Sequence, residues 1–178
     1  MYSDSFPEVV NHGGVNFKEK LAELKGKGVR IHPLVWDIMY LYLADHLSVI
    51  NLLCGFYIKR KMSISVVDGK KIRDYNRKAS RIIYVVLHPD KIQDDELELL
   101  KIKDEASRLG VEIKDFLSHY VSNRLNAIGL IIDDSIDPID PNPVSIDRAR
   151  RVYDDSSQII SILEGVRKEL QGIDRVQV

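Results

Sequence analysis

The stretch SIDRARRVYDDSSQIISILEGVRKELQGI, residues 145–173, has the clearest pattern in the chain. Its apolar and small residues recur in alternating steps of three and four. These residues are Ala149, Val152, Ser156, Ile159, Leu163, Val166, Leu170 and Ile173. A heptad spacing of this kind is typical of a helix that packs along its whole length against other helices. Ser145 can cap the first turn and Asp147 suits the positive end of the helix dipole, so we expect the helix to begin here.

A second helix is expected over residues 112–134, and the segment DPIDPNPV, residues 137–144, has three prolines and predicts a connecting loop. The two helices would form an antiparallel hairpin. A helix of roughly 25 residues is ~40 Å long, and a single small globule seldom covers so long a seam. The sequence therefore predicts a homodimer, in which two C-terminal hairpins make a four-helix bundle.

The N-terminal half is also expected to be mainly helical. A short helix is predicted at residues 17–25, and a long, mostly covered apolar helix at residues 33–61. In residues 63–72, SISVVDGKKI, β-branched residues precede an Asp-Gly pair, which is typical of a short β-hairpin or of a strand that enters a helix. The predicted fold is mostly α, with an N-terminal helical region at residues 1–92 and a hairpin domain at residues 93–178.

Composition excludes several classes of function. The 178-residue chain has a formal net charge of -1, which gives no electrostatic argument for binding nucleic acid. The single cysteine, Cys54, cannot form an intramolecular disulfide, and the N-terminus lacks the basic start and apolar block of a signal peptide. We therefore expect a cytoplasmic protein.

Residues 34–58 are long enough to cross a membrane but contain Asp37, Asp45 and His46. A charge at the centre of a span costs roughly 2.5–3.5 kcal/mol, so we expect a buried helix rather than a membrane span. His46 could be a metal ligand, but no second ligand stands at a suitable spacing. The chain has no phosphate-binding glycine loop, and no cofactor or metal is expected.

The stretch FLSHYVSNRLNAIGL, residues 116–130, places His119 among small polar residues. On a wheel of 100° per residue, one broad apolar arc contains Ile113, Phe116, Leu117, Tyr120, Val121, Ala127, Ile128 and Ile131, with Arg124 inside it. His119 lies on the other side, so we expect it to point outward. An exposed imidazole is largely neutral near neutral pH, and its ring nitrogen can accept a phosphoryl group and pass it on.

The residues Phe116-Leu117-Ser118-His119, followed by Arg124-Leu125-Asn126-Ala127-Ile128, resemble the H-box of histidine kinases. In that family a pattern like F-x-S-H-E-x-R-x-P-L-N-A-I marks the dimerisation and phosphotransfer domain. The resemblance covers about residues 94–178. It implies a signalling protein of the two-component type, with His119 as phosphoacceptor and an aspartate-bearing receiver domain as partner. Asn123, four residues on, and Arg124, whose fork can hold phosphate oxygens, are the expected helpers.

Two departures from the family's motif bear on the chemistry expected of His119. Tyr120 stands where the family has an acid, and Arg124 where it has a proline. No nucleotide-binding boxes occur, so an ATP-binding domain and complete kinase activity are not expected. Three alternatives stay open: a stand-alone histidine phosphotransferase, a degenerate relative that kept the bundle, or a non-enzymatic helical scaffold in which His119 is incidental.

Overall fold

The computed structural model describes residues 16–91, 97–136 and 139–171, and these residues are almost entirely helical. In chain order the elements are α1 (Phe17–Gly26), α2 (Pro33–Lys59), α3 (Val66–Leu87), the 3-10 helix η1 (Pro89–Lys91), α4 (Leu97–Ala106), α5 (Val111–Leu117), the π-helical turn η2 (Ser118–Ser122), α6 (Asn123–Ser135) and α7 (Ile146–Leu170). The predicted fold class, mostly α, is confirmed.

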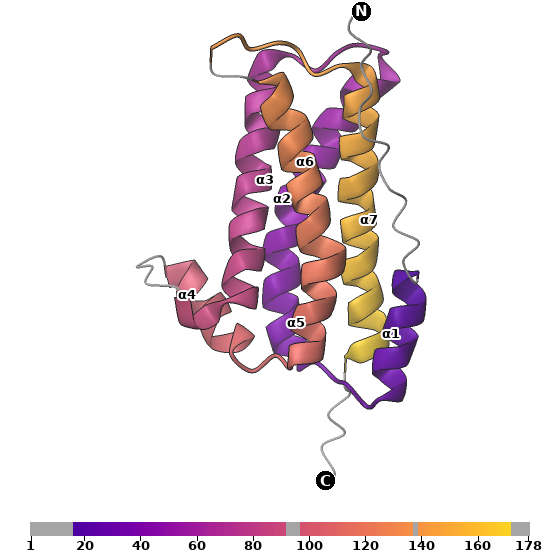
Figure 1. Cartoon of the computed structure of the whole chain (residues 1–178), viewed down its shortest axis with the longest axis vertical. Coiled ribbons are helices and arrows are strands. Elements are labelled where there is room, and N and C mark those ends of the chain that lie inside the picture. Colours follow the sequence, from indigo (N-terminus) through magenta and orange to yellow (C-terminus); the bar gives the residue numbers. More distant parts are fainter. Residues whose placement is uncertain (1–15, 92–96, 137–138, 172–178) are drawn as a thin grey trace, which may run out of the picture.

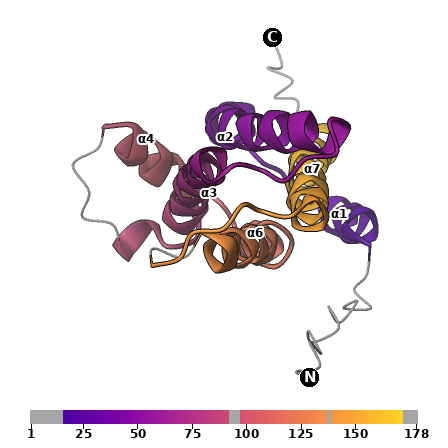
Figure 2. The same ribbon diagram turned by 90° about the horizontal axis from the view of Figure 1, so that it is seen from above.

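Four columns of helix form an up-down-up-down bundle (Figure 1). They are α2, α3, α7, and a single column made of α5, η2 and α6. Each column lies antiparallel to its two neighbours, and α2 and α7 close the ring. Seen from above, α1 lies outside α7 and α4 lies outside α3, on opposite sides of the bundle (Figure 2). Residues 33–87 therefore supply two columns of the bundle, and residues 111–170 supply the other two.

The long helix α2 covers α7 more extensively than any other element does. It begins at Pro33, whose missing N–H costs nothing in a first turn. Its buried residues recur at helical spacing and face the core. They are Trp36, Met39, Leu43, Leu47, Ile50, Cys54 and Tyr57. A hydrogen bond between the side chains of Asn51 and Ser156 joins α2 to α7 inside this contact.

The heptad seam of α7 is buried within one chain. The seam residues between Ala149 and Leu170 are at most 1% exposed, and the last seam residue, Ile173, lies outside the described residues. The predicted antiparallel arrangement of α6 and α7 is confirmed, but α2 and α3 supply the remaining two columns of the bundle. The homodimer prediction loses its basis, because the seam that seemed to need a second chain is covered by the N-terminal half of the same chain.

The structure does not support a β-hairpin at residues 63–72, one of the two possibilities that the sequence offered. Ile64 makes only an isolated bridge to Val144, and helix α3 begins two residues later. Ser65 caps this helix by accepting a hydrogen bond from the Asp68 amide at 3.2 Å. Gly69 is buried in the first turns, where an added Cβ would lie 2.1 Å from the Ile136 side chain. The Asp-Gly pair thus marks a close approach between helix and loop, and not a turn.

Within the described residues one stretch, Met39–Lys59 of α2, is long and apolar enough to cross a membrane by length and composition. The helix buries one side against α3 and α7, but only 22% of its 18-residue apolar window is buried, so the expected mostly covered helix is covered on one side alone.

The buried seam predicts a large difference between two leucines. Leu163 is fully buried in α7, whereas Leu130 in α6 is 73% exposed. We expect Leu163→Ala to lower the free energy of unfolding by about 2–5 kcal/mol, because it leaves a cavity between α7 and its neighbours. Leu130→Ala should change it by less than about 0.5 kcal/mol. Urea denaturation of both variants measures the difference, and equal losses would contradict the described packing.

Candidate functional site around His119

His119 is exposed, and it lies in the π-helical turn Ser118–Ser122 between α5 and α6. The sequence predicted its exposure, and the structure confirms it. A π-turn inserts one extra residue into a helix and is frequently found at functional sites. The imidazole ring of His119 packs edge-on against the ring of the neighbouring Tyr120, with 4.7 Å between the ring centroids. The imidazole is therefore oriented by its own helix while remaining open to solvent.

The inserted residue also changes which side chains face the core after the turn. The wheel placed Ile128 in the buried arc together with Arg124, Ala127 and Ile131, and it left out Leu125 and Ile132. The structure leaves Arg124, Ala127 and Ile131 half-buried and buries three residues, two of them outside the predicted arc. Those buried residues are Leu125, Ile128 and Ile132. A wheel of constant pitch misses this shift because a π-turn adds one residue without ending the helix.

A cavity of about 280 Å³ lies beside His119, between α1 and the column of α5 and η2. Its lining residues are Lys20, Leu24, Lys27, Glu112, Asp115, Phe116, His119 and Tyr120. Lys20 comes from α1, Lys27 is the C-cap of that helix, and the two acids come from α5. Asp115 precedes His119 by four residues and Glu112 by seven, a spacing that keeps all three on one helix face. The cavity therefore combines an imidazole with both cations and carboxylates.

The two lysines of this cavity are paired with a single carboxylate. Lys20 Nζ lies 2.8 Å from one oxygen of Glu23, and Lys27 Nζ lies 2.5 Å from the other. Hydrogen bonds from the two ammonium groups lower the pKa of Glu23 to about 2. The hydrogen bond to Glu23 raises the pKa of Lys27, and the charge of Glu112 across the cavity adds to this shift. Lys27 is therefore fully charged at neutral pH.

The two predicted helpers lie on the turn that follows His119. Asn123 is exposed at the start of α6. The guanidinium of Arg124 donates to Gln158 Oε1 from Nε at 2.9 Å and from Nη2 at 2.7 Å, and Nη1 donates to the Tyr120 carbonyl at 3.1 Å. The fork of Arg124 is thus occupied by α7 and by its own helix, and the structure directs it away from the cavity.

Sequence reasoning missed the residues that line the cavity with His119. Asp115 had a detectable signal, because it stands four residues before His119 on the same helix. Lys20 and Lys27 had none, because the fold alone brings α1 beside α5.

A second titratable group, Asp155 of α7, lies near Arg124 on the other edge of the α6 column. Desolvation by burial raises its pKa, and the charges of Arg124 and Arg151 offset only part of that effect. Ionisation of Asp155 therefore lowers the free energy of unfolding of the protein.

The remaining candidates from the sequence do not form a metal site. Among the described residues no group of three or more histidine, cysteine, aspartate or glutamate side chains could hold a metal ion. His46 packs against Tyr75 with 5.7 Å between ring centroids, at the contact of α2 and α3. Cys54 is fully buried, and burial raises the pKa of its thiol to about 12, so it is not a nucleophile at neutral pH.

Comparison of the chain with models of protein families, with curated proteins and with solved structures finds no match.

Because Asp155 is partly buried, replacing it with a neutral residue should raise the free energy of unfolding by an amount that depends on pH. The pKa of Asp155 is higher in the folded state than in the unfolded state. The wild type therefore loses stability as the pH rises from the unfolded-state pKa through the folded-state pKa. We expect Asp155→Asn to be more stable than the wild type at pH 7, and the difference to shrink toward pH 4. Urea unfolding at the two pH values tests this, with Asp74→Asn, an exposed carboxylate of α3, as control. A constant difference between pH 4 and 7 would contradict the assignment.

Proposed function

We propose that the protein is a histidine phosphotransfer protein of the two-component type, with His119 as phosphoacceptor. The observation that supports this most directly is the exposed imidazole on a π-turn, beside a cavity that also contains two lysines. The H-box-like residues around His119 point to the same chemistry. The partner is an aspartate-bearing receiver domain, which would dock over the exposed surface of η2.

The reaction is an exchange between two phosphorylated side chains. A neutral ring nitrogen of His119 attacks the phosphorus of an acyl phosphate on the receiver. The new P–N bond forms as the P–O bond to the aspartyl carboxylate breaks, and the electron pair leaves with that carboxylate. The reverse reaction passes the group to a second receiver. Asp115, four residues before His119, takes the role of the acid that the family places directly after its histidine.

In this proposal one chain does what two chains do in a dimeric H-box bundle. Helices α2 and α3 occupy the positions that the hairpin of a second protomer would hold, and the histidine-bearing column faces outward. The free, buried thiol of Cys54 fits a cytoplasmic location. Neither ATP nor another cofactor is needed, because the donor already carries an activated phosphoryl group.

One observation favours a second function, that of a non-enzymatic interaction protein. On α2, Leu41 is 66% exposed, Leu52 is 74% exposed and Phe56 is 46% exposed. Large apolar side chains at the surface favour contact with another protein. In this alternative His119 is incidental, and phosphoryl transfer would not be observed.

We expect His119→Ala to abolish acid-labile phosphorylation by phosphoramidate or by a phosphorylated receiver. The substitution should change the free energy of unfolding by less than about 0.5 kcal/mol, because the side chain is exposed. His88→Ala, an exposed histidine at the end of α3, is the matched control and should be labelled like the wild type. Labelling is measured by phosphorus NMR and by mass spectrometry at neutral pH. Unchanged labelling of His119→Ala, or an unlabelled wild type, would refute the proposal and leave the interaction protein as the alternative.

A further inference from the structure

Helix α1 supplies one wall of the cavity beside His119, although it is distant in the sequence. We infer that Lys20 and Lys27 bind the phosphoryl group carried by His119, and that Glu23 occupies both lysines until the group arrives. This inference rests on the proposed phosphotransfer function and adds to it the residues that hold the transferred group.

The spacing of the three charged residues places them together. Lys20, Glu23 and Lys27 stand at positions i, i+3 and i+7 of the helix and its cap, which lie on one face. Leu24, between them, is 2% exposed and lines the same cavity. The buried leucine and the two lysines therefore line the same cavity from the side of α1.

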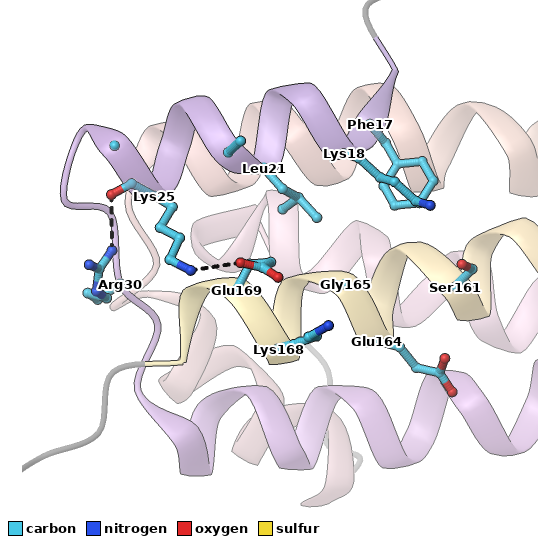
Figure 3. Close-up of a pocket in the computed structure, with 12 residues that line it drawn as sticks. Phe17, Lys18, Leu21, Lys25, Arg30, Ser161, Glu164, Gly165, Lys168 and Glu169 are labelled. Atoms are coloured by element: carbon cyan, nitrogen blue, oxygen red, sulfur yellow. Dashed lines mark hydrogen bonds and ion pairs between the residues drawn. The ribbon is translucent and has the colours of Figure 1, made fainter.

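Contacts on the opposite face fix how α1 lies (Figure 3). Leu21 packs over Gly165 of α7, where an added Cβ would lie 3.0 Å from Leu21 Cδ1. Lys25 Nζ pairs with Glu169 at 2.8 Å, and Arg30 donates to the Lys25 carbonyl at 3.3 Å. These contacts set the rotation of α1 about its axis, and with that rotation Lys20 and Lys27 line the cavity beside His119.

The charges around the cavity show why these lysines are needed. Glu112 and Asp115 of the histidine-bearing column line the cavity, and their carboxylates alone would repel a phosphoryl group. Lys20 and Lys27 offset that repulsion.

Glu23 is a competitor that the phosphoryl group can displace. It offers the lysines one negative charge and two oxygens, and it is 41% exposed. A phosphoryl group offers close to two negative charges and three acceptor oxygens. Ammonium groups form stronger hydrogen bonds with the more highly charged acceptor, so both lysines should transfer from Glu23 to the phosphorylated histidine.

The test is the equilibrium of phosphoryl exchange between the full-length protein and free imidazole. The P–N bond of N-phosphoimidazole breaks as a P–N bond to His119 forms, and phosphorus NMR follows both species. We expect Lys20→Ala and Lys27→Ala each to lower the equilibrium constant about two- to fivefold, as for a partly exposed charge pair. Lys20→Arg should retain it, and Glu23→Gln should raise it. Lys18→Ala is the matched control, because Lys18 faces the groove on the other side of α1.

The outcomes separate the two proposals. If the wild type is phosphorylated at His119 but Lys20→Ala and Lys27→Ala behave like Lys18→Ala, the inference about α1 is wrong and the phosphotransfer function stands. If the wild type is not phosphorylated, both are wrong. An unchanged equilibrium constant in Glu23→Gln would show that Glu23 does not compete for the lysines.

Discussion

The apolar side of α2 lies along the seam of α7, and the Asn51–Ser156 hydrogen bond is the polar point inside this contact. The Ser156 hydroxyl is buried and the Asn51 amide is half-buried, so their hydrogen bond favours one alignment of the two helices over others. The other columns depend on that register. Helix α6 packs on the next side of α7, and α1 lies where Gly165 leaves room for Leu21. One helix pair thus positions both walls of the cavity at His119.

The sequence identifies the elements of this bundle better than it identifies their partners. The heptad spacing of α7 and its start after Ser145 were predictable, because both depend on local periodicity and capping. A heptad pattern shows that a helix is covered, but it does not show which chain covers it. That is why the seam predicted a dimer, although α2 of the same chain lies on it. The Asp68-Gly69 pair misled for a related reason: glycine favours a turn, but it also permits the close contact that Ile136 makes here.

At the site, local spacing predicted the exposure of His119 and could have identified Asp115. It could not reveal the π-turn, since a wheel assumes a constant 3.6 residues per turn. The one-residue shift after Ser122 buries Leu125 and leaves Arg124 free to reach Gln158. The lysines of α1 depend on tertiary packing alone. The sequence therefore indicates the proposed nucleophile, and the fold adds the charges that surround it.

Because all four columns of the bundle come from one chain, the bundle can form without a second chain. A bundle assembled from two chains loses stability on dilution, whereas the contacts that make this bundle lie within one molecule. Each bundle also contains one His119 rather than a symmetric pair. A protein with this architecture can stay folded at a very low copy number, and two copies of the same site cannot influence each other within one bundle.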